Sequence, residues 1–445
     1  MNRHLKRILF AIGLCVLHHS ADADSVRKEM LYGDRIDLRI ATDRDPLSYS
    51  ENEPMIFNIT ANWQKNTQPF PVFIEWERTG DDGKVEKGKA PVGETPLTLK
   101  TSLDRPGFIR IYGKLVDKNG NPIKRIGYGN SIENLTVDSG AAVKPETLRG
   151  TSEPADFDEY WKRQKGRLKT TPLSPEMRKI EETPHAISYA VKIPCSPDTN
   201  PVTGYLSIPR NRPLKSCRIH IYFHGYGYAP QNELLRAKKQ GLGNKYVIQF
   251  IINAHGYNLE ESPEYYQDFE RKIRSGKYSY AFDPVQNSNP DTAYFNGMAL
   301  RVMRALEFLK TLPEWNGKDL VVYGGSQGGL QAIWAAGLDP DVSEARISIP
   351  WCCDFGGAKN FGRLAATWRL EYKPALDYFD PINFAKRIKC PVTISRAGLG
   401  DYTCPPSGIA VFYNNLACPK EIRWYQNSTH GYVPKDPQII IRKEK

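Results

Sequence analysis

Apolar and polar residues alternate with a period of two through the first third of the chain. Residues 55–61, 71–76 and 107–113 are three such runs, and clusters of Gly, Asn and Asp separate them. This alternation is typical of strands that turn one face to a core. It predicts an antiparallel β-sandwich of immunoglobulin-like type over residues 24–145, acting as a spacer or docking module rather than as a carbohydrate-binding one.

The pattern changes after about residue 150. Residues 156–161 begin an amphipathic helix, and apolar residues recur at steps of four and three from Phe295 to Leu309. A hairpin is predicted from two runs and buried strands from six more: 187–191 and 202–208, then 218–223, 246–252, 320–323, 347–349, 392–395 and 422–425. Strands that alternate with helices predict a doubly wound, mostly parallel α/β sheet in residues 146–445. Residues 260–289 fit neither pattern and are expected to form a cap or lid.

The first residues have the pattern of a secretory signal peptide. Basic residues precede an apolar run at residues 8–17, and a small-residue cleavage site ends at Ala23. Residues 1–23 therefore predict a secreted or periplasmic protein. A lipid anchor on Cys15 is the weaker alternative, because the bulky Leu14 precedes it. No later stretch reaches 18 apolar residues, so no membrane span is expected.

The net charge and the cysteine content exclude few classes of function. The formal net charge is +11, and residues 271–277 are the notable basic cluster. No nucleic-acid motif accompanies this cluster, so we expect a solvated surface and no nucleic-acid partner. Seven cysteines follow Ala23, and no Cys-x-x-Cys pair or zinc-ligand spacing occurs among them. No metal is expected, and an odd number leaves at least one unpaired thiol in a monomer.

One short motif carries most of the chemical information. Residues 321–330 read VVYGGSQGGL, in which a β-favouring run meets a glycine-lined turn and then a helix-forming segment. A serine at the apex of such a turn, here Ser326, is typical of a nucleophile elbow. The alternative is a glycine-rich turn whose serine only caps the following helix.

Partners for this serine follow it in the chain. A serine hydroxyl needs a base, and the base needs a carboxylate that orients it. Asp401 follows the predicted strand at 392–395, and His430 follows the one at 422–425. Because active sites gather at the carboxyl ends of parallel strands, the order Ser326, Asp401, His430 predicts a catalytic triad.

Acyl transfer also needs backbone donors for the developing oxyanion. The residue after the nucleophile, Gln327, supplies one N–H. The loop after the strand at 218–223 supplies the second, which we assign to Tyr226, with Gly227 as the nearest rival.

Other residues near these loops have less certain roles. His224 precedes the serine, which breaks the expected order of a triad, so a structural hydrogen bond is favoured over a catalytic role. His255 lies on another loop after a strand, and it and Trp351 are candidates for lining the pocket.

Several of these motifs resemble one family, the acetyl xylan esterases and cephalosporin-C deacetylases of carbohydrate esterase family seven. The resemblance covers about residues 150–440 and is carried by residues 156–161, His224-Gly225-Tyr226, Gly324-Gly325-Ser326-Gln327-Gly328-Gly329, Gly398-Leu399-Gly400-Asp401, Cys404-Pro405-Pro406 and His430. It implies an α/β-hydrolase fold, with Ser326 as nucleophile, Asp401 as acid, His430 as base, and Tyr226 and Gln327 as oxyanion donors. No cofactor is implied.

Two positions depart from the family pattern. The Arg-Gly-Gln motif expected after residues 246–252 is here part of Ala254-His255-Gly256-Tyr257, and the glutamate expected after the histidine is Gly431. The family's ring-shaped oligomer would also have to accommodate the β-rich N-terminal part.

The predicted function is therefore a secreted serine esterase that removes O-acetyl groups from plant polysaccharide or oligosaccharides. Three alternatives stay open: an esterase for bulkier sugar esters such as feruloyl, a serine peptidase of oligopeptidase type, and a non-catalytic carbohydrate-binding protein. The intact triad argues against the last of these. A β-rich part of about 120 residues without blade repeats argues against the peptidase.

Overall fold

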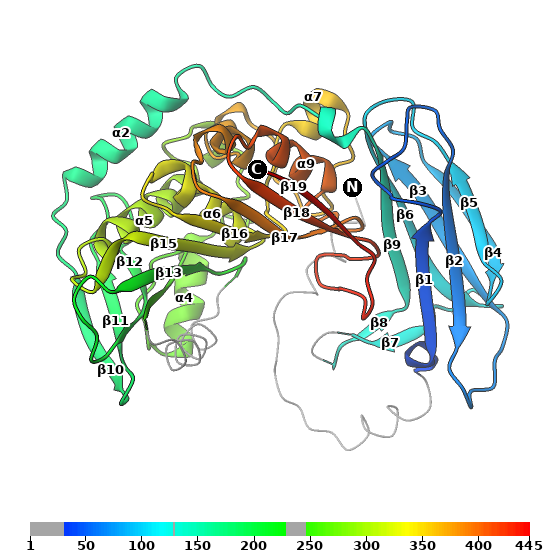
Figure 1. Cartoon of the computed structure of the whole chain (residues 1–445), viewed down its shortest axis with the longest axis horizontal. Helices are drawn as coiled ribbons and strands as arrows, with labels where there is room; N and C mark the ends of the chain where they lie inside the picture. Colours follow the sequence, from blue (N-terminus) through cyan, green and yellow to red (C-terminus); the bar gives the residue numbers. More distant parts are fainter. Residues whose placement is uncertain (1–30, 128–129, 228–245) are drawn as a thin grey trace.

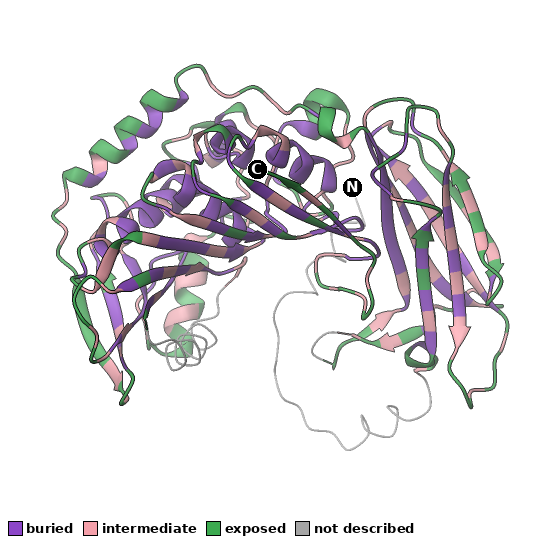
Figure 2. Ribbon diagram, in the orientation of Figure 1, coloured by how far each residue is buried: buried purple, intermediate pink, exposed green. Residues whose placement is uncertain are grey.

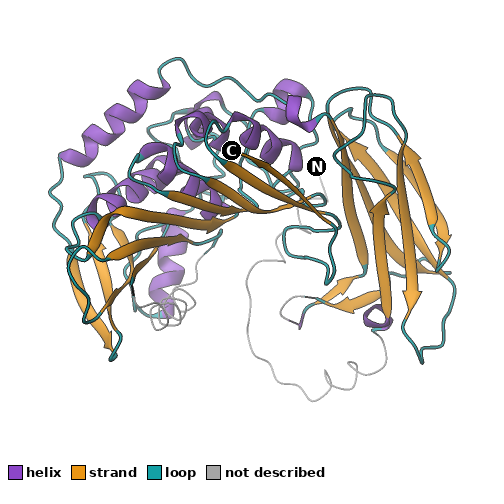
Figure 3. Cartoon of the chain, in the orientation of Figure 1, coloured by secondary structure: helices purple, strands orange, loops and turns teal. Residues whose placement is uncertain are grey.

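A computed structural model describes residues 31–127, 130–227 and 246–445 of the chain. The predicted signal peptide lies outside these residues. Two β-rich layers at one end adjoin a larger body in which helices pack on a long sheet (Figures 1 and 3). Within the described residues, no helix is both long and apolar enough to cross a membrane.

The N-terminal part is a sandwich of two antiparallel sheets. One sheet has the order β1 (Ile36–Thr42), β2 (Met55–Trp63), β5 (Leu97–Thr101), and the other the order β4 (Glu86–Val92), β3 (Val72–Gly80), β6 (Gly107–Asp117), β9 (Thr136–Val143). A small hairpin of β7 (Lys124–Ile126) and β8 (Ile132–Asn134) lies beside them, and a 3-10 turn, η1 (Tyr32–Arg35), precedes β1.

The period-two pattern of the sequence explains why these strands form a sandwich. Along β2, Met55, Phe57, Ile59 and Ala61 are fully buried, and the residues between them are half-buried (Figure 2). They share one core with apolar residues of the second sheet, among them Ile74. Burying one such side chain contributes about 1.5–3 kcal/mol, so this core alone is sufficient to fix the strand register.

The larger part is built on one mixed sheet of ten strands. Their order in space is β10 (Glu176–Glu182), β11 (Ala186–Ile193), β12 (Val202–Pro209), β14 (Val247–Ile252), β13 (Cys217–Phe223), β15 (Trp315–Gly325), β16 (Glu344–Ser348), β17 (Val392–Gly398), β18 (Lys420–Tyr425), β19 (Ile439–Glu444). The strands from β14 to β18 pair in parallel, and the outer ones pair antiparallel.

The strand order locates the functional edge of this sheet. The chain goes from β13 to β14 on one side and then to β15 on the other, so its direction of progress reverses at β13. Ligands of doubly wound sheets bind outside the carboxyl ends of the strands at such a reversal. Phe223 pairs with Gly324 at that edge, which places the loops after β13 and β15 next to each other.

Helices connect the strands and cover the sheet. They are α2 (Phe157–Lys169), α4 (Pro263–Ile273), α5 (Tyr294–Leu309), α6 (Gln327–Leu338), α7 (Gly357–Phe361), α8 (Pro381–Phe384) and α9 (Pro406–Asn415), with 3-10 turns η3 (Pro145–Thr147), η4 (Gln286–Ser288), η5 (Pro374–Tyr378) and η6 (Ala385–Arg387). Helix α6 is apolar on all sides, and Leu330, Ile333 and Trp334 are fully buried between the sheet and its neighbours (Figure 2).

The structure adds elements that the pattern did not predict. Helix α4 lies inside the tract 260–289, where Ser262 accepts the backbone N–H of Tyr265 and Pro263 occupies the first turn. This capping signal was readable in the sequence. Strands β10 and β19 were missed because most of their residues are exposed and show no buried face. All seven cysteines of the described residues are unpaired thiols.

Candidate active site

The turn between β15 and α6 is a strained elbow with Ser326 at its apex. Ser326 has φ 55° and ψ −122°, a conformation that is costly for a residue with a side chain. The Ser326 N–H donates to the Ser348 carbonyl at 3.0 Å, and the Ser326 carbonyl accepts from Leu330 and Trp351 at 3.1 Å each. The Ser326 side chain makes no capping hydrogen bond, which argues against the reading of a simple helix cap.

The glycines around Ser326 are required by close backbone contacts. A Cβ on Gly324 would lie 2.1 Å from the Gly328 carbonyl oxygen, and one on Gly328 would lie 2.1 Å from the Phe223 oxygen. The motif therefore uses glycine so that helix α6 can start directly behind β15 and against the end of β13.

Asp401 and His430 meet on the neighbouring loops after β17 and β18. The His430 Nδ1 lies 3.0 Å from Oδ2 of Asp401, which is fully buried. Oδ1 of Asp401 accepts backbone N–H groups from Thr403 and Cys404, both at 3.0 Å. An ionised carboxylate can only accept hydrogen bonds, so the His430 nitrogen that contacts Asp401 must be the donor. Nδ1 therefore carries the proton and Nε2 is left as a base.

Cys404 connects this pair to the serine. Its Sγ lies 3.7 Å from His430 Nδ1, and its thiol is within hydrogen-bonding reach of the Ser326 hydroxyl. Within the described residues, Asp401, Cys404 and His430 are a set whose ligand atoms, within 4.8 Å of one another, could hold a metal ion. Burial, followed by the charge of Asp401, raises the pKa of the Cys404 thiol well above its ordinary value.

The loop after β13 carries one predicted oxyanion donor, Tyr226, and its rival, Gly227, while the other donor, Gln327, begins α6. The Gly227 N–H donates to the Tyr280 hydroxyl at 2.9 Å, so this rival donor is already occupied. No described residue accepts a hydrogen bond from the N–H of Tyr226 or of Gln327. The Tyr280 ring stacks on Tyr226 with 4.1 Å between centroids, and its hydroxyl donates to Oε1 of Gln327 at 2.9 Å. Tyr280 thus ties both donor residues together, and no motif in the sequence identified it.

The two nearby histidines have structural positions. Nε2 of His224 accepts the Ala254 N–H at 3.0 Å, so its Nδ1 donates to the Gly225 carbonyl at 2.6 Å, as expected for a structural residue. The side chain of His255, a predicted pocket residue, is fully buried. Its Nδ1 lies 2.8 Å from the Tyr294 hydroxyl. Burial, followed by the charge of His224, lowers the pKa of His255 well below its ordinary value.

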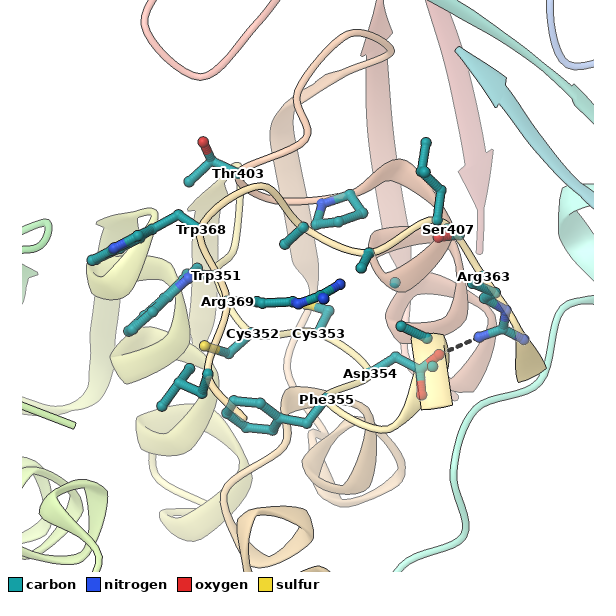
Figure 4. A pocket seen from close by; sticks show the side chains of 18 residues that line it. Trp351, Cys352, Cys353, Asp354, Phe355, Arg363, Trp368, Arg369, Thr403 and Ser407 are labelled. Carbon is teal, nitrogen blue, oxygen red and sulfur yellow. Dashed lines mark hydrogen bonds and ion pairs between the residues drawn. The ribbon is translucent and has the colours of Figure 1, made fainter. Parts of the chain in front are cut away.

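Trp351, whose backbone N–H donates to the Ser326 carbonyl, lines a cavity. The cavity has a volume of about 80 Å³ and is bounded by the segment after β16 and by the start of α9 (Figure 4). The rings of Trp351 and Trp368, which both line the cavity, stack on each other with 5.0 Å between centroids. Arg363 forms an ion pair with Asp354 on the other side of the cavity (Figure 4). Tyr226 contacts the Trp368 ring edge-on at 4.4 Å. Contacts between aromatic rings therefore connect this cavity to the loop after β13, which carries Tyr226.

Strand β9 of the sandwich packs directly on the loops of Asp401 and His430. Oε1 of Gln426 accepts from the Ser139 hydroxyl and from the Gly140 N–H, and its Nε2 donates to the Gly140 carbonyl at 3.0 Å. Oδ1 of Asn427 accepts the Asp138 N–H at 3.0 Å. No sequence signal predicted these contacts between residues almost 290 positions apart.

A buried ion pair lies at this same contact. Arg110 of β6 is paired with Asp138, and its guanidinium lies 4.5 Å above the ring of Tyr402. Burial raises the pKa of Asp138 to about 6; the charge of Asp401 acts in the same direction, and Arg110 opposes both. The sandwich therefore places a charged group close to the predicted catalytic acid.

Comparison with known proteins agrees with this arrangement. A family model described as acetyl xylan esterase matches residues 145–369 and 370–440. The acetyl esterase Axe7A of Xylanibacter ruminicola is 30% identical over 382 residues, which cover 79% of this chain and 83% of that protein.

Two solved structures share the fold. The acetyl xylan esterase from Paenibacillus sp. R4 is 27% identical with a TM-score of 0.53, over 65% of this chain and 94% of that one. Acetyl xylan esterase 1 from Thermoanaerobacterium sp. JW/SL YS485 is 21% identical with a TM-score of 0.53, over 66% and 94%. The family match, the mixed sheet and these neighbours agree: the chain is a carboxylic ester hydrolase of α/β-hydrolase fold and belongs to the acetyl xylan esterase family.

Proposed function

We propose that the protein removes O-acetyl groups from plant polysaccharide or its oligosaccharides through a Ser326–His430–Asp401 acyl-enzyme mechanism. The observation that carries this proposal is the 3.0 Å contact between His430 Nδ1 and the buried Asp401, next to the Ser326 elbow. Membership in the acetyl xylan esterase family supports the acetyl ester as substrate.

In the first half of the reaction, Ser326 Oγ attacks the acetyl carbonyl carbon while His430 Nε2 takes the hydroxyl proton. The oxyanion that forms accepts the N–H groups of Gln327 and Tyr226, for which the described residues offer no other acceptor. Asp401 holds the imidazolium in place. His430 then returns the proton to the sugar oxygen, which leaves as the C–O bond to the acetyl group breaks.

In the second half, water attacks the acetyl-Ser326 ester as His430 takes one of its protons. The tetrahedral intermediate collapses to acetate and regenerates the serine. We further propose that the protein is exported by residues 1–23, and that its sandwich is of immunoglobulin-like type, which its seven antiparallel strands in sheets of three and four support.

Acetate release from acetylated xylan and from peracetylated xylose and xylo-oligosaccharides tests the proposal. The Ser326→Ala variant should lose about 10⁴-fold or more in kcat, because the nucleophile and its base act as a unit. Ser207→Ala, which alters a buried serine on β12, is the matched control and should keep wild-type activity. Equal rates for wild type and Ser326→Ala would contradict the mechanism. A wild type that hydrolyses small esters but no acetylated saccharide would contradict the substrate class.

A further inference from the structure

A second hollow lies between the sandwich and the loop that carries His430. It has a volume of about 480 Å³, within the range of roughly 300–1,000 Å³ that small-molecule sites occupy. The loop after β18 lies beside β7 and β8, and residues of all three line the hollow (Figure 1). We call the hollow the hairpin groove; the lining residues that matter here are Arg125, Ile126 and Glu133 of the hairpin and Thr429, Tyr432 and Val433 of the loop.

The groove combines polar groups with apolar side chains that face solvent. The Arg125 guanidinium lies 4.3 Å above the Tyr432 ring and 3.7 Å from the Glu133 carboxylate. Nε of Arg125 is buried, and none of the described residues accepts a hydrogen bond from it. Ile126 and Val433, which also line the groove, are 46% and 38% exposed and offer apolar surface to a ligand. A free buried donor beside exposed apolar surface indicates a ligand.

The position of the groove relates it to the leaving group. Thr429 and Gly431 flank His430, and both line the groove. In the proposed reaction His430 returns its proton to the sugar oxygen, so the sugar lies on the His430 side of the scissile bond. Gly431 keeps this side open, because a Cβ there would meet no atom within 4 Å. The glutamate of the family pattern would extend into this space.

We propose that the hairpin groove is a saccharide subsite, which binds sugar residues of the leaving chain beyond the acetylated one. The inference rests on the proposed function. A xylose ring presents hydroxyl groups at its edge and C–H groups on its faces, which matches a groove lined by both polar and apolar side chains. Arg125 is paired with Glu133, and Asp138, which also lines the groove, is paired with Arg110. Because each charge has a partner, the groove suits a neutral sugar rather than a charged one. The sandwich thereby takes part in substrate selection.

The test compares substrates of different length. For each protein, kcat/KM is measured with acetylated xylohexaose and with 4-nitrophenyl acetate, and their ratio is the readout. Tyr432→Ala and Arg125→Met should each lower the ratio about tenfold. Phe73→Ala is the matched control, since Lys89 lies over the Phe73 ring at 5.7 Å outside the groove. General damage near His430 lowers both activities and leaves the ratio unchanged.

Binding provides a second readout that does not depend on turnover. Calorimetry with unacetylated xylohexaose compares Ser326→Ala with the double variant Ser326→Ala/Tyr432→Ala, and the double variant should bind about tenfold more weakly. Equal affinities, or ratios unchanged within twofold, would overturn the subsite. If the wild type releases acetate from no saccharide, the proposed function fails, and the calorimetric comparison still decides the groove.

Discussion

The proposed nucleophile and its two proposed partners are held in different ways. Ser326 belongs to an elbow whose backbone contacts, to Phe223, Ser348 and Trp351, stay within the α/β part of the molecule. Asp401 and His430 stand on loops that rest on strand β9, a part of the other core. One half of the site is therefore built by local backbone geometry, and the other depends on contacts between the two parts of the molecule.

This difference has a consequence for the role of the sandwich. The Gly400 position allows the Asp401 loop to approach β9, because a Cβ there would lie 2.1 Å from the Asp138 carbonyl oxygen. Gln426 fills its hydrogen-bonding capacity with β9 as well. A spacer domain would not need such contacts, so we expect the sandwich to hold in place the loops of the proposed acid and base.

The largest effect is expected inside the elbow. The Gly328→Ala change places a methyl group 2.1 Å from the Phe223 oxygen, which must displace α6 and the Gln327 N–H. Loss of one oxyanion donor costs about 10²–10³-fold, so kcat should fall about 10³-fold in an acetate-release assay. A variant with wild-type kcat would show that the elbow is not the reacting centre.

The matched change at the sandwich contact is Gly400→Ala, whose Cβ would also lie 2.1 Å from a backbone oxygen. It should shift the Asp401 loop by a fraction of an ångström to about 1 Å and lower kcat about 10²-fold, because a misplaced catalytic group is costly. Gly166→Ala in α2 is the control, since its Cβ meets no atom within 4 Å. An unchanged kcat in Gly400→Ala would show that the position of the Asp401 loop does not depend on its contact with β9.

A smaller effect is expected from removing the amide that joins the two parts. Gln426→Ala leaves the Gly140 N–H and carbonyl without partners in a buried contact. The free energy of unfolding should fall by about 1–3 kcal/mol in urea titration, and kcat by about tenfold. Gln331→Ala, at a buried position within α6, should affect stability without loosening the His430 loop. Equal losses of kcat and of unfolding free energy in the two variants would argue against a special role for β9.

The smallest expected effect is on the pH dependence of the free energy of unfolding. Asp138 has a pKa of about 6 in the folded protein, above its ordinary value of 3.8, so the folded state binds this proton more tightly than the unfolded chain does. Its contribution to the free energy of unfolding should therefore decrease as the pH rises from about 4 to about 6. Asp138→Asn lacks this titration, so the difference between wild type and variant should change over that range and level off above it. Parallel curves in urea titrations at each pH would contradict this assignment.

Much of the hydrolase sheet was predictable from local sequence, because a nucleophile elbow and short buried strands leave strong local patterns. Short β-favouring runs predicted a strand before each of Ser326, Asp401 and His430, and each residue does follow a strand. Strands β10 and β19 could not be found, since strands exposed on most positions lack a period-two burial pattern.

What the sequence could not predict depends on contacts between distant segments. Tyr280 reaches the oxyanion loop from a tract without clear periodicity, and Ser139 meets Gln426 across 287 positions. His255 was a reasonable pocket candidate on its loop, but its environment of Tyr280 and Tyr294 buries it fully. Side-chain patterns report burial in local elements, and they carry no information on which loop packs on which domain.

Amide hydrogen exchange, compared between wild type and Gln426→Ala, tests the two-part construction of the site most directly. Exchange should become about fivefold faster or more in residues 398–404 and 426–432, which contact β9, because their opening free energy falls by about 1 kcal/mol or more. Residues 324–330 of the elbow should keep their wild-type rates and serve as the internal reference. Equal acceleration in all three segments, or none in any, would show that the sandwich does not hold the acid and the base.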